Sequence, residues 1–264
     1  MVQYYDSISD NLRDWALDQQ VFFTASAPLV GKHINISPKG LPASTFTIFD
    51  ANHAAYIDAT GSGSETISHL YENRRITIMF CSFALSPRIM RFFCTGSVVE
   101  WDSAAFEPLL ERMGKARVEG ARAVILLDVW KVQTSCGFGV PLLTITPSTS
   151  PPSPPLSPSL SPSPTPTSQP VLKDRDTLGH WASKMVAKDA MMGYQAQWNA
   201  DSLDGLTGLR AARRTRGERM WVTGLRARGR RVLGQGEALG WGFVLGVAAV
   251  VVWLWILGAV TGGR

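Results

Sequence analysis

RITIMFCSF (residues 75–83) is followed, after the four residues ALSP, by RIMRFFCTGSVVEW (88–101). Both runs are rich in β-branched and aromatic residues and are separated by a proline, so both are predicted to be strands. Five more runs of the same kind lie around them, with Gly, Pro, Asn or Asp between them: 21–27, 32–37, 45–50, 54–60 and 121–132. Seven strands at such close spacing predict a β-barrel or a sandwich.

Helices are expected between and after these strands. Two apolar stripes with helical spacing interrupt the strands, and a longer helix-like stretch, 171–209, comes later. The stripes are Ile67, Leu70 and Tyr71 in one case, and Phe106, Leu109, Leu110 and Met113 in the other. The 171–209 stretch begins with acidic residues and is predicted to form one or two helices that pack back on the barrel.

The loop DATGSGSETISHL (58–70) allows two compatible interpretations. Ser62 and Glu65 have the spacing of a capping box, so Ser62 is expected to cap the following helix. The start of that helix also offers free N–H groups and a positive dipole end, which can hold a phosphate without a lysine.

Composition divides the chain into five predicted segments. Residues 1–145 form the main barrel domain, and 171–209 its helical C-terminal part. Between them, 146–170 holds ten of the sixteen prolines with many serines, and it cannot bury enough apolar surface to offset its ordering entropy. It is predicted to be a disordered insertion. A ligand for a proline-recognising module, a phosphorylated linker, and a tolerated insertion or gene-model artefact are its open interpretations.

Charge is distributed unevenly along the chain. The net charge is +5, but residues 210–264 hold ten of the 26 basic residues and only two acids. Residues 1–209 therefore carry 16 basic and 19 acidic residues, a net charge of −3. This balance argues against a nucleic-acid-binding surface on the folded part. Three cysteines and four scattered histidines lack metal-ligand spacing, so we expect buried thiols in a reducing compartment and no metal site.

The C-terminal end resembles a membrane anchor. A basic segment, 210–237, precedes an apolar segment, 238–260, that has no charged residue. The apolar length suits a transmembrane helix, and positive flanks stay on the cytoplasmic side, so the globular part is expected to face the cytosol. Anionic lipid headgroups are the expected partners of the arginines. A buried helix and a mistranslated reading frame are the alternatives.

Two strands carry candidate ligand-binding side chains. In KHINISPKG (32–40), polar residues that include Asn35 and Ser37 alternate with Ile34 and Ile36, and Lys39 follows them. The polar face suits either a ligand or solvent. In the strand RIMR, Arg91 shares an apolar face and needs an anionic partner, for which a phosphate and a structural carboxylate are equally suitable.

These pieces, in order, resemble the pyridoxamine 5'-phosphate oxidase-like family of flavin-binding split barrels. The resemblance is carried by HINISPKG, AYIDATGSGSETISHLYENRRITIMFCSF, PRIMRFFCTGSVVEW and TSCGFGVPLL, and then by KDRDTL and NADSLDGLTGL. It covers roughly residues 10–145 and 171–209. It implies a fold that is mainly β with flanking helices, a six-stranded antiparallel split barrel, a homodimer, and FMN bound between the subunits.

The resemblance also implies which residues hold the FMN. The basic and hydroxyl residues at matching positions are expected to bind its phosphate, and two polar residues of the second strand are expected to reach the isoalloxazine edge. The phosphate set is Lys39, Ser62, Ser64, Thr66, Arg88 and Arg91, and the edge set is Asn35 and Ser37. Two family features are missing. The chain has no C-terminal Arg-Leu-x-Pro motif, and GSGSET replaces the Ser-Arg-Lys motif of the turn.

The resulting hypothesis is an FMN-dependent oxidoreductase of unknown substrate. The sequence has no GxSxG, HExxH, Walker or GxGxxG motif, and no catalytic acid or base is assigned. The alternative is a non-catalytic, cofactor-free split barrel that acts as a binding or scaffold protein tethered to a membrane.

Overall fold

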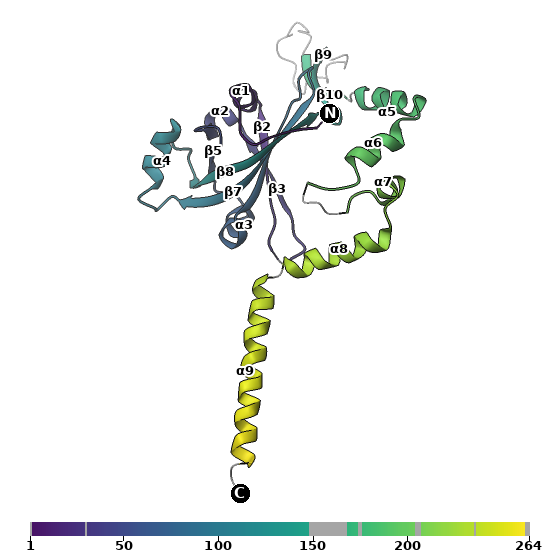
Figure 1. Ribbon diagram of the computed structural model, residues 1–264. Helices are drawn as coiled ribbons and strands as arrows, with labels where there is room; N and C mark the ends of the chain where they lie inside the picture. The colour runs from purple at the N-terminus through teal and green to yellow at the C-terminus, as the bar shows by residue number, and fades with distance from the viewer. Residues whose placement is uncertain are drawn as a thin grey trace, which may run out of the picture. The chain divides into compact units, whose positions relative to one another are not determined.

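The computed structural model describes residues 2–29, 31–147, 168–173, 176–203, 207–234 and 236–261 (Figure 1). The chain divides into two compact units, Met1–Leu178 and Gly179–Arg264, which are described separately. Most of the predicted insertion, 148–167, lies outside the described residues.

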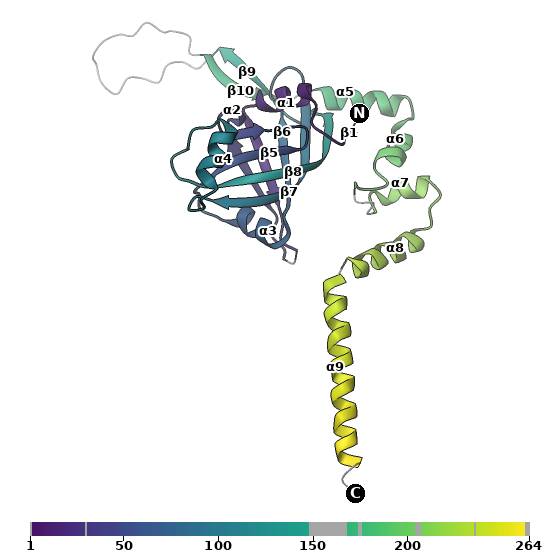
Figure 2. The ribbon, with the colours of Figure 1, turned by 60° about the vertical axis from the view of Figure 1, so that its left-hand side comes forward.

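The first unit is built on one antiparallel sheet, which curls around its core (Figure 2). Within the described residues it has eight strands, in the order β3-β2-β6-β7-β8-β5-β4 with β1 paired to β8. Two strands are short, β1 (Gln3–Tyr5) and β4 (Phe46–Ile48). The six longer ones are β2 (Val21–Ser26), β3 (Asn35–Gly40), β5 (His53–Ala59), β6 (Arg75–Cys81), β7 (Arg88–Glu100) and β8 (Ala121–Cys136). The predicted antiparallel split barrel is therefore confirmed.

The barrel interior is filled by aromatic side chains. Alternation along each strand turns every second residue inward, as in β2, where Phe22, Thr24 and Ser26 are buried and their neighbours are half-buried. Five rings in this core are fully buried: Phe22, Phe46, Tyr56, Phe80 and Phe92. Edge-to-face contacts such as Phe22 with Phe46, at 5.2 Å between ring centroids, stabilise the packing.

Helices cover the outside and the ends of the sheet. They are α1 (Asp10–Leu17), α2 (Pro42–Thr45), α3 (Glu65–Asn73) and α4 (Phe106–Met113). The predicted stripe of α4 packs on Ala55, Ile57 and Val124, on the outer face of β5 and β8. Helix α3 lies close against β7, because a Cβ at Gly96 would stand 2.6 Å from Leu70 Cδ2. Glycine at position 96 therefore allows the close contact between α3 and the sheet.

Two elements differ from the sequence-based expectation. Strand β3 begins at Asn35 rather than at residue 32, and β8 continues to Cys136 rather than ending at 132. A separate two-stranded sheet pairs β9 (Leu142–Pro147) with β10 (Ser168–Lys173), so the first and last residues of segment 146–170 lie in strands. Cys81 and Cys94 are buried as expected, but Cys136, the last residue of β8, is exposed.

The second unit is helical in its described part. The 171–209 stretch contains α5 (Thr177–Ala187) and α6 (Met191–Trp198), so the expected pair of helices is present. They are followed by α7 (Arg210–Thr215), α8 (Met220–Leu233) and α9 (Gly236–Thr261). Within α9, Ala238–Ile256 is the one stretch of the described chain that is long and apolar enough to cross a membrane, by length and composition.

Candidate functional site

The polar row of β3 lies on the barrel side of the sheet. Asn35 pairs with Ser26, Ser37 with Thr24, and Lys39 with Phe22, and all three β2 partners are buried. Paired residues of antiparallel strands point to the same face, so the β3 row faces inward at an edge of the sheet. The intervening Ile36 points outward and is 66% exposed. Of the two options for this polar face, a ligand and solvent, the inward direction favours a ligand.

A buried carboxylate holds two cations at this edge. Asp58, in β5, is fully buried, and its Oδ1 is 2.7 Å from Lys39 Nζ while its Oδ2 is 2.8 Å from Arg122 Nε. The Lys39 and Arg122 side chains each keep 22% of their surface exposed. The three groups carry a net charge of +1, so together they form a solvent-reachable cationic surface over a buried anion.

A β-bulge explains the position of Arg122. Asp58 pairs with Ala123 and Ala59 pairs with Ala121, so Arg122 is the extra residue on β8. Bulges redirect a side chain that regular pairing would place elsewhere. Neither Arg122 nor Asp58 was predicted from the sequence. The available signal was a charged residue inside an otherwise apolar stretch, AYIDA for Asp58 and ARAVILL for Arg122.

Hydrogen bonds connect this edge to the start of α3. Arg122 Nη1 donates to the Gly63 carbonyl at 2.8 Å, Asn35 Nδ2 donates to Thr66 Oγ1 at 3.0 Å, and Ser37 Oγ donates to Asn35 Oδ1 at 3.2 Å. Four predicted residues, Asn35, Ser37, Lys39 and Thr66, thus meet Asp58 and Arg122. We call these six residues the Asp58 cluster.

The two serines of the Gly-rich loop behave differently from the prediction. Ser62 does not cap α3: the N-cap is Ser64, and its side chain makes no capping hydrogen bond. The helix starts one residue after Ser64, at Glu65, so the expected pairing of Ser62 with Glu65 is out of register. Both serines are exposed, and in the sequence they lie between the cluster residues Asp58 and Thr66. Their hydroxyls form no hydrogen bond with the described residues.

Arg88 and Arg91 lie away from the Asp58 cluster within one chain. Strand β7 pairs directly with β8, but Arg88 and Arg91 pair with Cys136 and Gln133, near the end of β8 opposite to Arg122. Arg91 donates from Nη1 to Gln133 Oε1 at 3.1 Å, so its partner here is a neutral amide rather than the expected phosphate or carboxylate. Desolvation lowers the pKa of Arg91 below its usual value. The Arg88 guanidinium carbon lies 5.3 Å from the centre of the Trp15 ring, in a cation–π contact.

Two buried hydroxyls lie beneath the Asp58 cluster. Tyr56 precedes Asp58 by two residues on the same strand face, and Thr24 lies opposite Ser37. Both hydroxyl oxygens are buried without a hydrogen-bond partner among the described residues. Burial raises the pKa of Tyr56 well above its usual value, so its phenol stays protonated.

Two histidines lie near the same edge. His69 Nδ1 is 2.9 Å from Ser26 Oγ, and the His33 ring lies 6.0 Å from the His69 ring. The described residues contain no group of three or more His, Cys, Asp or Glu side chains that could hold a metal ion. The donors of the Asp58 cluster are instead an ammonium, a guanidinium, hydroxyls and an amide. Groups of these kinds bind phosphate.

The sequence is similar to a known protein family. A family model described as pyridoxamine 5'-phosphate oxidase matches residues 8–136. The pyridoxamine 5'-phosphate oxidase family protein ustO of Aspergillus flavus is 50% identical over 220 residues, which cover 83% of this chain and 82% of that protein.

Solved structures with a similar fold cover about half of this chain. A HupZ variant from Group A Streptococcus is 21% identical, with 48% of this chain and 99% of that chain covered and a TM-score of 0.40. An FAD-binding protein from Mycobacterium smegmatis is 10% identical, with coverages of 50% and 97% and a TM-score of 0.35. The curated relative matches most of both sequences at half identity, and on that ground the chain belongs to the pyridoxamine 5'-phosphate oxidase family.

Proposed function

We propose that this protein is an FMN-dependent oxidoreductase whose Asp58 cluster receives the flavin phosphate. The observation that carries the proposal is the placement of Lys39 and Arg122 on the two oxygens of one buried carboxylate, at 2.7 and 2.8 Å. Asp58 fixes both cations before a ligand arrives, which reduces the entropy cost of binding. Family membership supports a flavin as the ligand.

The residues of the Asp58 cluster have separate tasks in this proposal. Lys39 and Arg122 attract and hold the anion, while the Thr66 hydroxyl and the Asn35 and Ser37 side chains donate hydrogen bonds beside it. Asp58 is a positioning residue, because it is fully buried and contacts the two cations. Bound FMN would supply the hydride chemistry.

We further propose a homodimer formed through the outer face of the sheet. This face carries half-buried or exposed apolar residues, including Phe93 and Trp130, whose rings lie 5.7 Å apart, and Ile36. Arg91 lies on it, half-buried with its amide partner Gln133. In the proposed dimer, a second copy covers this surface and brings an anionic group to Arg91. Light scattering on the purified protein tests this: a monomer would overturn it.

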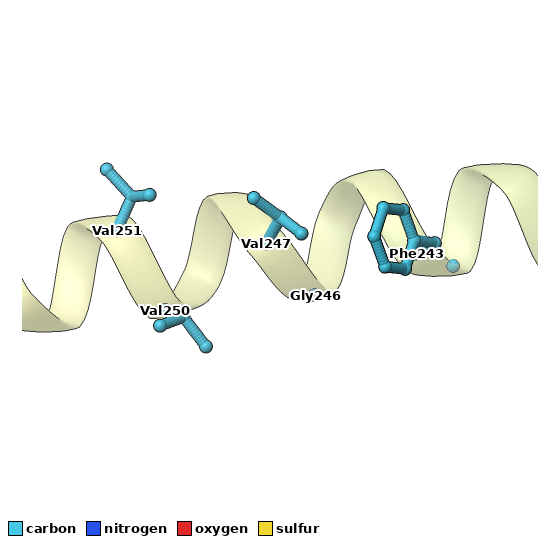
Figure 3. Close-up of a pocket in the computed structure, with 6 residues that line it drawn as sticks. Phe243, Gly246, Val247, Val250 and Val251 are labelled. Carbon is cyan, nitrogen blue, oxygen red and sulfur yellow. The ribbon is translucent and has the colours of Figure 1, made fainter.

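The proposed location is a membrane surface, with α9 as a tail anchor. Its apolar span Ala238–Ile256 has a mean hydropathy of 2.2 and is 0% buried in the structure. Figure 3 shows part of its surface, a groove of about 520 Å³ lined only by glycine and apolar residues: Gly242, Phe243, Gly246, Val247, Val250 and Val251. Such a surface suits lipid chains. A fluorescent fusion that stays fully soluble would remove the anchor, and a fusion lacking 238–260 is the control.

A cofactor-free scaffold is the second candidate, and one observation favours it. The cations of the Asp58 cluster already have a partner, and Asn35 is bonded to Thr66 at 3.0 Å, so much of the cluster is satisfied without a ligand. A structural role for these residues would need no flavin.

The decisive experiment is the visible spectrum of the full chain purified in neutral detergent, before and after addition of FMN. The flavin hypothesis predicts a yellow protein, or one that quenches FMN fluorescence on titration. A colourless protein that takes up no FMN would overturn the hypothesis and leave the scaffold. An Arg117→Gln variant is a suitable control, because Arg117 pairs with Glu107 on the surface at 2.5 Å.

A further inference from the structure

The second unit contains a pocket that the proposed flavin site does not explain. It has a volume of about 550 Å³ and lies between α7 and α8. Arg210 and Arg214 line one part of it, and Met220, Trp221 and Thr223 line another. Trp221 is 65% exposed, so the indole is available to a ligand.

The arginines around α7 divide into two sets. Arg213 is buried, with its Nη1 2.7 Å from Glu218 Oε2 and its Nη2 bonded to Asp201. Arg216 Nη1 lies 2.9 Å from Asp201 Oδ2. These two arginines are neutralised by the acids, and they hold the local fold together.

Arg210 and Arg214 form the other set. They are four residues apart, so they lie on one side of α7. Both are exposed and form no ion pair with any acid in the described part of the chain. The pocket therefore has two uncompensated positive charges beside an apolar wall, which is the surface that an anionic amphiphile requires.

The neighbouring sequence indicates which amphiphile. The pocket residue Gly224 precedes the apolar span Ala238–Ile256 by 14 residues, along α8. Tryptophan and arginine together are typical of the membrane–water interface, where the ring contacts acyl chains and the cation contacts phosphate. We propose that the pocket binds the phosphate headgroup of an anionic phospholipid. The choice of a lipid rests on the proposed tail anchor.

Binding of short-chain lipids to the full chain in neutral detergent tests the pocket. The probes are short-chain phosphatidic acid, short-chain phosphatidylcholine and inorganic phosphate, measured by titration calorimetry. We expect phosphatidic acid to bind. Phosphatidylcholine, which lacks the net negative charge, and inorganic phosphate, which lacks the acyl chains, should each bind at least about tenfold more weakly. Inorganic phosphate that binds as tightly as phosphatidic acid would overturn the lipid assignment.

Matched variants test the residues. The double change Arg210→Gln with Arg214→Gln is expected to weaken phosphatidic acid binding by about 30-fold, since each cation contributes about fivefold near anionic lipid. Arg219→Gln is the control, because Arg219 is exposed and does not line the pocket. Equal loss in the control and the double variant would overturn the pocket.

A further variant distinguishes binding of the acyl chains from binding of the phosphate headgroup. Trp221→Ala should weaken phosphatidic acid binding and leave phosphate binding unchanged, and circular dichroism checks that the helices remain. Because the assay is in detergent, it does not depend on membrane insertion of α9. If the fluorescent fusion is soluble but the protein binds phosphatidic acid, only the tail-anchor proposal is overturned. If the fusion is anchored in membranes but the protein does not bind phosphatidic acid, only the pocket proposal is overturned.

Discussion

The barrel and the helical unit each present two cations to a ligand, but they hold them differently. Lys39 and Arg122 are fixed on the buried carboxylate of Asp58, with 22% of each side chain exposed. Arg210 and Arg214 are exposed around a pocket and have no acidic partner in the described residues. The first arrangement favours a defined geometry for one small anion. The second favours attraction to a charged surface and tolerates variation in the ligand.

The largest expected effect comes from removing the buried carboxylate. Asp58→Asn leaves two neighbouring cations without their partner, so we expect the free energy of unfolding to fall by about 2–4 kcal/mol. Glu107→Gln, which breaks the exposed pair with Arg117, should change it by less than about 1 kcal/mol. Urea denaturation of both variants measures the difference. Equal midpoints would show that Asp58 does not fix the cations.

The next effect separates ligand binding from stability. Arg122→Gln should weaken FMN binding by about tenfold or more, because a charge-assisted hydrogen bond contributes about 1.5–3 kcal/mol. Arg117→Gln, with the same change of charge outside the Asp58 cluster, should bind FMN like the unmodified protein. Fluorescence quenching of FMN provides the dissociation constants. If Arg122→Gln retains full affinity, the phosphate does not lie on the Asp58 cluster.

Salt should distinguish the two pairs of cations. Raising the ionic strength from about 0.05 to 0.5 M shortens the Debye length to a few ångströms and screens exposed charges. Binding of anionic lipid at Arg210 and Arg214 is therefore expected to weaken several-fold. The unfolding midpoint of the barrel should move little, since the carboxylate that pairs with Lys39 and Arg122 is fully buried. A barrel as salt-sensitive as the lipid binding would contradict the comparison.

The smallest effect concerns an exposed pair on the barrel. Tyr71 donates a hydrogen bond of 2.6 Å to Glu100, which raises the pKa of Tyr71 to about 12. Because the folded pKa is raised, the contribution of this bond to stability is complete below the usual tyrosine pKa of about 10 and is lost as the pH rises through 12. Absorbance titration of Tyr71→Phe should lack the tyrosinate step near pH 12 that the unmodified protein shows. An unchanged titration would exclude the hydrogen bond.

Much of the barrel could be predicted because its signals are local. Alternation and β-branched composition placed β2, β5, β6 and β7 within one or two residues of their observed bounds. The stripe of α4 was read from its spacing alone. The pairing of β9 with β10 could not be anticipated, because the proline-rich segment separates the two strands in the chain. Each becomes a strand only through its hydrogen bonds to the other.

Four of the six residues of the Asp58 cluster were predicted from the sequence. Asn35, Ser37 and Lys39 lie in the alternating polar stretch 32–40, and the family resemblance assigned them and Thr66 to the site. Arg122 was missed because a β-bulge, not a motif, directs it to Asp58. Arg88 and Arg91 were grouped with the loop although, within one chain, they lie near the end of β8 opposite to Arg122.

By itself, the sequence determined strands β2 to β8 and helices α3 to α6, that the end of the chain is basic and then apolar, and which family the chain resembles. These properties follow from side-chain size, polarity and spacing, which act over a few residues. Only the tertiary structure decided which charges meet. Asp58 joins Lys39 and Arg122, 19 and 64 residues away, while Arg210 and Arg214 have no acidic partner among the described residues and Arg213, between them, is paired. Ion pairing depends on distances of a few ångströms, and those are set by strand order, register and the bulge.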